Sequence, residues 1–353
     1  MKALIIMGGL ALGIIVGLLP GINKPTPVWW RFIIMVLITA TIFLNLMPPL
    51  AGTLEEVKFL TGKVEYESLP VLIKYHNTGS ELPAPDSEGM IAVPISNAAA
   101  EKPSASMLIP AGLIDKNISP ADEVLVNIKY SQAKKAFEYA STTAVNPSLV
   151  LPYIGGLKDR IRIMNFHVPV AWVTVLAYLV SMIYAIMYLR KRDLEYDTKA
   201  VAAAMLGTMF CILATVTGMI WAKFNWGSFW NWDPREVSIF ILLLIYFAYF
   251  SLRAAIDNEQ TKARLSAVYS IIAFITVPFL VFILPRLQDS LHPGSKSDGN
   301  MGPVLSSGAD MLNPVMQVNF GIALAGFTML FFWLLNLTYR YKKLNNDIVK
   351  FNQ

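Results

Sequence analysis

Charged residues are scarce in this chain of 353 amino acids. Asp, Glu, Lys and Arg make up 15% of it, against roughly 25% in an ordinary soluble domain. Hydrophobic residues make up 55%, and the mean hydropathy is +0.51. This balance argues against a soluble enzyme and predicts a polytopic membrane protein.

Cysteine is almost absent, since Cys211 is the only one and lies within an apolar run. A single cysteine excludes an intramolecular disulfide, a CxxC redox pair and a cysteine-ligated iron–sulfur cluster. Any part of the chain outside the membrane therefore folds without disulfides. Histidine is also rare, at three residues.

The net charge of +5 does not indicate nucleic-acid binding. Residues 55–162 hold 13 acidic and 11 basic side chains, and the remainder holds 11 acidic and 18 basic ones, a net charge of +7. This surplus lies at the ends of apolar runs, where membrane topology predicts it. We expect membrane lipids as partners and no nucleic acid.

Seven apolar segments are long enough, or nearly so, to cross a bilayer as helices of about 20 residues. They are 3–22, 33–50, 167–189, 200–222, 237–252, 265–285 and 317–339. A signal peptide is the alternative for the first, but its long apolar run without a small-x-small cleavage site favours a helix. The sequence thus predicts an all-α polytopic membrane protein with about seven transmembrane helices.

Lys and Arg counts predict the orientation of these helices. Three segments are rich in these residues: there are four in 190–199, three in 253–264 and four in the tail from Arg340. The alternate loops of the C-terminal half hold two each. The richer segments, including the C-terminus, are therefore expected in the cytoplasm. By parity, the N-terminus and the long segment after the second helix lie outside.

Four parts are expected along the chain: two helices in 1–50, an extracytoplasmic insert in 51–163, a five-helix core in 164–340 and a cytoplasmic tail in 341–353. Strand-like alternation at 63–67 and 71–75 is followed by a Pro/Ser/Ala-rich stretch at 83–110. Ser119-Pro120, with acidic residues just after it, predicts an amphipathic helix over 119–141. The insert is expected to be a small α+β module with a flexible arm.

The alternating direction of the helices also predicts which histidines and tryptophans share the outer membrane face. The junctions on the outer side contain His167, His292 and a cluster of aromatic residues: Trp226, Phe229, Trp230 and Trp232. Two of the three histidines therefore share a face with the densest group of tryptophans. His76 lies in the insert, where we expect no special role for it.

Two neutral imidazoles on opposite sides of a haem complete the coordination of its iron, and aromatic faces suit the flat apolar ring. Basic side chains near the propionates are available as Arg160, Arg162, Arg235 and Arg286. Asp233 has the wrong sign for this and is expected to cap the next helix or to accept a hydrogen bond from a tryptophan N–H. The alternative is an ordinary aromatic belt with interfacial histidines.

These residues carry a resemblance. The segment Trp226-Gly-x-x-Trp230-x-Trp232-Asp233-Pro resembles the WWD signature of the haem-handling cytochrome c biogenesis proteins CcmC, CcmF and CcsA/ResC. The segment from Arg162 to Trp172, with His167, and the loop Ser290-Leu-His292-Pro-Gly are similar to the two histidine regions of CcmC. The resemblance runs from about residue 158 to 340, roughly half of the chain, and is closest to CcmC.

The resemblance implies that haem b binds transiently and non-covalently at the outer face of the cytoplasmic (inner) membrane. His167 and His292 would be the axial ligands, and the WWD segment would be the platform. In the CcmC branch, haem passes to the chaperone CcmE, with CcmD and CcmAB as further partners, and the protein presents haem rather than acting as an enzyme. In the CcsA branch, the protein works with CcsB and attaches haem to apocytochrome c.

The chain departs from both patterns. It has an additional first helix and the long insert, which we interpret as a docking module, and its Asp233-Pro-Arg-Glu segment looks more like CcsA. It lacks the histidines that CcsA-type synthases place within the membrane, which argues against a self-contained synthase. A b-type cytochrome that exchanges electrons with quinone is disfavoured because the histidines lie on one side only. A transporter of another substrate is disfavoured because the helices hold almost no ionisable groups near the midplane.

Overall fold

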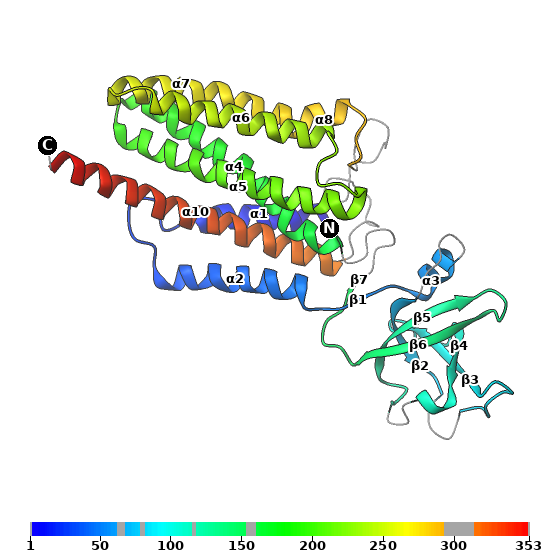
Figure 1. Cartoon of the computed structure of the whole chain (residues 1–353). Helices are drawn as coiled ribbons and strands as arrows, with labels where there is room; N and C mark the ends of the chain where they lie inside the picture. The colour runs from blue at the N-terminus through cyan, green and yellow to red at the C-terminus, as the bar shows by residue number, and fades with distance from the viewer. Residues whose placement is uncertain are drawn as a thin grey trace. The chain divides into compact units, whose positions relative to one another are not determined.

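The computed structural model describes residues 2–61, 68–77, 82–114, 118–152, 160–292 and 314–351 (Figure 1). The chain divides into two compact units. One consists of Met1–Leu46 with Arg162–Gln353, and the other consists of Met47–Ile161.

The first unit is helical. Its elements are α1 (Lys2–Leu18), α2 (Val28–Leu46), α4 (Ile161–Lys191), α5 (Leu194–Trp226), α6 (Pro234–Ala254), α7 (Glu259–Pro278), the π-helical segment η4 (Phe279–Ile283), α8 (Leu284–Leu287) and α10 (Pro314–Phe351). In the described part of the chain, 6 helical stretches are long and apolar enough to cross a membrane, and Ile5–Leu18 is a shorter apolar helix. The chain is therefore a multi-pass membrane protein, and the predicted helical fold is confirmed.

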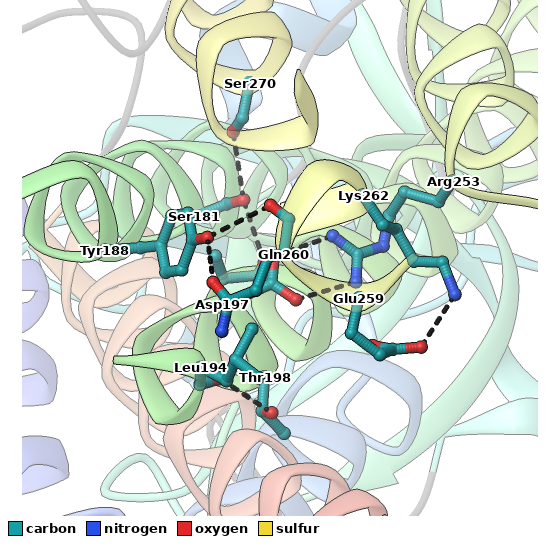
Figure 2. Close-up of polar contacts among 11 residues, drawn as sticks. Ser181, Tyr188, Leu194, Asp197, Thr198, Arg253, Glu259, Gln260, Lys262 and Ser270 are labelled. Atoms are coloured by element: carbon teal, nitrogen blue, oxygen red, sulfur yellow. Dashed lines mark hydrogen bonds and ion pairs between the residues drawn. The ribbon is translucent and has the colours of Figure 1, made fainter. Parts of the chain in front are cut away.

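Helices α4 and α5 occupy the middle of this unit, between the α6–α7 pair on one side and α10 on the other (Figure 1). Tyr178 of α4 stacks on Tyr246 of α6, with 3.4 Å between ring centroids. The Ser181 hydroxyl contacts the Ala200 carbonyl at 2.9 Å and the Ser270 hydroxyl at 3.2 Å, so it ties α4 to α5 and α7 (Figure 2). Polar contacts of this kind position helices where hydrophobic packing alone is weakly directional.

Helix α1 packs against α10 through glycines. A Cβ at Gly9 would meet the backbone of Gly321, and a Cβ at Gly13 would lie 2.8 Å from the Thr328 Cβ. Small residues let two helix backbones approach closely inside a membrane. The α1–α2 turn is held by Asn336, whose amide donates to the carbonyl oxygens of Gly21, Ile22 and Lys24. The segment predicted as the first helix is thus an integral part of the bundle.

The second unit is a closed five-stranded barrel. Its strands are β2 (Leu69–Tyr75), β3 (Met90–Asn97), β4 (Ala105–Pro110), β5 (Glu123–Ser131) and β6 (Ala136–Val145), in the order β2-β3-β4-β6-β5. Only β4 and β6 pair in parallel, and β2 closes the barrel against β5. This is the strand order of the OB-fold. Val71, Ile73, Val126 and Phe137 are fully buried in the interior.

Short elements surround the barrel. Helix α3 (Leu54–Thr61) precedes β2, and the 3-10 turn η2 (Ala111–Leu113) follows β4. Strand β1 (Leu50–Ala51) pairs in parallel with β7 (Leu151–Pro152), so the two ends of the unit lie side by side. Together with the helical unit, this confirms the predicted all-α membrane fold with a small α+β insert.

Two predictions within the insert are wrong. The helix predicted over 119–141 is replaced by strands β5 and β6, and the flexible arm predicted at 83–110 holds strands β3 and β4. The acidic residue taken as a helix-start signal closes a turn instead, because Asp122 Oδ2 accepts from the Ser119 N–H at 2.7 Å. The strand predicted at 71–75 is confirmed within β2, and the one at 63–67 lies outside the described residues.

Candidate functional site

His167 lies in the second turn of α4, with its ring against α5. Its Nδ1 is 3.1 Å from the Thr217 Oγ1, and that hydroxyl donates its own proton to the Leu213 carbonyl at 2.8 Å. The Thr217 oxygen therefore accepts, which makes Nδ1 the protonated nitrogen and leaves the lone pair on Nε2. The ring lies so close to Gly218 that a Cβ there would be 3.0 Å from the His167 Cε1.

The tryptophan-rich loop between α5 and α6 is fixed at both ends. Helix α5 ends at Trp226 and is capped by Gly227, which adopts φ 82° and donates to the Lys223 carbonyl, as a C-terminal glycine commonly does. Helix α6 begins with a capping box, in which Asp233 caps the helix and Glu236 accepts from the backbone N–H of Asp233. Glu236 also accepts from the Asn231 N–H at 2.7 Å. The predicted capping role of Asp233 is confirmed.

The aromatic residues of this loop face different surroundings. Trp226 contacts His292 edge to face, with 4.6 Å between ring centroids. Trp230 packs edge to face on Trp232, and Trp232 is 75% exposed with its backbone at φ 56°. Phe229 is also exposed. The loop therefore supplies one indole beside a histidine and an exposed aromatic surface next to it.

His292 is joined to this loop by Asp233. The His292 Nδ1 donates to Asp233 Oδ1 at 2.9 Å, while Asp233 Oδ2 accepts from the Ser290 hydroxyl at 2.7 Å and the Leu291 N–H at 2.8 Å. Burial by itself would raise the pKa of Asp233, but the hydrogen bonds from His292, the Arg235 N–H and Ser290 hold it below its usual range. The carboxylate is thus charged and fixes the ring of His292 with Nε2 left available.

Both histidines lie against the C-terminal part of α5. His292 and Arg235 both lie within electrostatic range of His167, and Arg286 lies within electrostatic range of Arg235. Arg162 instead donates to the backbone carbonyl of Asn45 at 2.7 Å, at the end of α2. The structure therefore brings Arg235 near His167 and uses Arg162 to tie α4 to α2.

These groups suit a flat, apolar ligand that carries a metal and negative charges. Two imidazoles offer Nε2, Trp226 provides an indole, and two guanidiniums of like charge lie near each other. Like charges repel, so an anionic group between them would relieve the repulsion. The donor set thus fits a haem, with axial imidazoles and basic partners for its propionates.

The profile of one protein family matches this chain. The family is CcmC, described as heme exporter protein C, and the match covers residues 148–350, more than half of the chain. The chain belongs to the CcmC family.

Individual members of the CcmC family support this assignment. Heme exporter protein C of Bradyrhizobium diazoefficiens is 30% identical over 190 residues, which cover 54% of this chain and 67% of that protein. The corresponding protein of Paracoccus denitrificans is 29% identical over 175 residues, 50% of this chain and 70% of that protein. Heme exporter protein C of Escherichia coli K12 is 27% identical over 177 residues, 50% of this chain and 69% of that protein.

The CcmC match contains both histidines, the tryptophan-rich loop and the arginines described above, whereas α1, α2 and the barrel precede it. Sequence reasoning missed Thr217, Gly218, Ser290 and Glu236 as parts of the site. Glu236 has a sequence signal, because Asp233 followed by Glu at the third position is a capping-box pattern. Thr217 has none, since it lies 50 residues from His167 and meets it only through the packing of α4 on α5.

Proposed function

We propose that this CcmC-family protein handles haem during cytochrome c maturation, binding haem b transiently and presenting it to an acceptor. The placement of His167 and His292 against the C-terminal part of α5 carries the proposal, together with membership of a family named for haem export. Each imidazole has its Nδ1 engaged in a hydrogen bond and its Nε2 left for iron. The cargo is held and passed on, so its binding needs no chemical step by the protein.

Distinct roles follow for the surrounding residues. His167 and His292 supply the axial ligands, and Trp226 stacks beside the ring. Trp230, Trp232 and Phe229 extend the aromatic platform toward the surface from which haem is handed over. Arg235, with Arg286 near it, meets the propionates, while Arg162 secures the helix that carries His167. Asp233 orients His292.

Orientation follows from the basic segments at the other end of the bundle. The positive-inside rule places the α4–α5 and α6–α7 turns and the C-terminus in the cytoplasm. The histidine end of the bundle and the barrel then face outward from the inner membrane. We propose a haem chaperone similar to CcmE as the acceptor, with CcmD- and CcmAB-like partners.

A CcsA-type synthase subunit, working with a CcsB-like chain on apocytochrome c, is the second candidate. The Pro-Arg-Glu continuation after Asp233 favours it. Against it, His167 is the only histidine within a spanning helix, and it lies near the start of that helix. Whether the purified protein attaches haem to a CxxCH peptide distinguishes the two candidates.

An optical spectrum tests the proposed function. Protein purified from haem-sufficient cells is expected to show a Soret band with sharp reduced α and β bands, weakened in His167→Ala and in His292→Ala. His76→Ala is the matched control, because His76 lies in the barrel unit. A wild-type protein that stays colourless on addition of hemin would refute the assignment.

We further propose that the barrel is a docking module for the haem acceptor. It lies outside the CcmC match, yet it is a complete closed barrel with its own core. Deletion of residues 60–150 is therefore expected to leave the Soret band intact while haem delivery to the acceptor is lost. Loss of the Soret band on deletion would contradict a docking role.

A further inference from the structure

The two histidines differ in the group that holds Nδ1. For His292 it is the Asp233 carboxylate, whose side chain is 1% exposed. For His167 it is the neutral hydroxyl of Thr217, with the Ala214 carbonyl as a further neutral oxygen nearby. Thus a charged acceptor faces one ring and only neutral acceptors face the other.

This difference alters how strongly each imidazole binds a metal. A carboxylate that accepts from Nδ1–H pulls the proton away from the ring, so Nε2 becomes a stronger electron-pair donor. A hydrogen bond to a charged acceptor is roughly twice as strong as one between neutral groups. The Thr217 hydroxyl is the weaker acceptor of the two, because its oxygen carries no charge.

The acceptors of the two Nδ1–H groups are also held by different numbers of hydrogen bonds. Asp233 cannot rotate freely, because it accepts from Ser290, Leu291 and Arg235 besides His292. Trp226 packs against the His292 ring. His167 has one side-chain hydrogen bond, to Thr217, among those described, and the flat backbone of Gly218 beside it.

We propose that His292 is the firm ligand and His167 the labile one, so that His167 releases the cargo first at hand-over. This inference rests on the proposed function. In that step the bond between iron and His167 Nε2 breaks, the electron pair stays on nitrogen, and the oxidation state of iron does not change. A lone-pair donor, either water or a side chain of the acceptor, takes the vacated position. Asp233 is the positioning residue that sets this order.

Variants that retain one histidine test the proposal directly. Resonance Raman spectra of the ferrous haem-loaded protein report the stretch between iron and the remaining imidazole. The stretch in His167→Ala, which retains His292, is expected at higher frequency than the stretch in His292→Ala. Adding Asp233→Asn is expected to lower the stretching frequency in His167→Ala and to leave it unchanged in His292→Ala.

Asp233→Asn removes the charge but keeps a helix cap, since Asn caps helices as well as Asp does. Loss of an outer hydrogen-bond partner typically costs on the order of 10–100-fold in metal affinity. In the otherwise intact protein, Asp233→Asn is therefore expected to weaken His292 ligation by that factor in imidazole-displacement kinetics. Asp257→Asn is the matched control, because it makes the same change at an exposed carboxylate in the α6–α7 turn, and Asp233→Glu is expected to restore part of the loss.

Equal stretching frequencies in the two single-histidine variants would overturn the proposal, and this comparison needs no change at Asp233. An Asp233→Asn variant with the wild-type stretch and displacement rate would also overturn it. Absence of a Soret band from the wild-type protein would instead refute the proposed function, so the two failures are distinguishable.

Discussion

At the scale of single residues, the site depends on close approaches that leave no room for larger side chains. Asp233 contacts His292, Ser290 and the first turn of α6 with one buried carboxylate. Gly218 leaves space for the ring of His167. Neither residue needs to touch the cargo to determine how it is held.

Gly218→Val is expected to displace the ring of His167, because even a Cβ would lie 3.0 Å from Cε1. Such overpacking costs about 1–3 kcal/mol, which corresponds to roughly 5- to 150-fold in haem affinity. Hemin titration followed by the Soret band measures the change. Val216→Ile on the same helix also adds bulk, but Val216 is 48% exposed, so its affinity should match the wild type. Equal affinity in Gly218→Val would contradict this packing argument.

At the scale of elements, helix contacts decide which segments belong to the bundle. Gly9→Val is expected to push α1 away from α10, since its side chain would meet the Gly321 backbone. The expected loss is about 1–3 kcal/mol, seen as a lower unfolding temperature in detergent. Gly8→Val is the control, because a Cβ at Gly8 meets nothing within 4 Å. Similar effects from both variants would show that α1 does not pack as described.

A buried ion pair joins the start of α5 to the end of α6. Arg253 donates to both oxygens of Asp197, at 2.7 and 2.8 Å, and their side chains are 13% and 8% exposed (Figure 2). Asp197→Ala leaves the guanidinium without its carboxylate and is expected to cost about 3–5 kcal/mol of folding stability.

Thermal unfolding in detergent measures this cost. Glu259→Ala is the control, because it removes the carboxylate of the nearby Glu259–Lys262 ion pair, in which the glutamate is exposed. Exposed ion pairs contribute at most about 1 kcal/mol. Replacing both Asp197 and Arg253 with apolar residues should recover most of the stability lost in Asp197→Ala. A double variant as unstable as the single one would show that the pair does more than balance its own charges.

At the scale of the whole molecule, a CcmC-type helical core is joined to two preceding helices and a barrel. The family match begins at residue 148, after α1, α2 and all five barrel strands. The additional helices pack on α10 within the bundle, whereas the barrel has its own closed core. Its role as a docking module stays a prediction that the deletion tests.

The single cysteine makes the orientation measurable. Cys211 is buried, so a membrane-impermeant maleimide should label a newly introduced cysteine with little background. Ala140→Cys, exposed on β6, is expected to react from the outer side of spheroplasts. Asp257→Cys, in the α6–α7 turn, is expected to react only after lysis. The reverse pattern would invert the proposed orientation.

Much of the helical fold was predictable because its signals are local. Apolar runs of helix length mark the spanning segments, and Asp233-Pro-Arg-Glu marks the start of α6. The insert was harder, because strand pairing joins distant residues and Asp122 suits both a helix start and a turn. The tryptophan-rich loop between α5 and α6 was predictable as a feature, but the contact of Asp233 with His292 was not.

The sequence by itself determined the membrane class, the approximate positions of the spanning helices, the family and the two candidate histidines, since these follow from composition, periodicity and short motifs. Only the tertiary structure decided what each histidine contacts. Thr217 lies 50 residues from His167, and Asp233 lies 59 residues from His292. Such pairs form when helices pack, so no local pattern encodes them, and they distinguish two otherwise identical imidazoles.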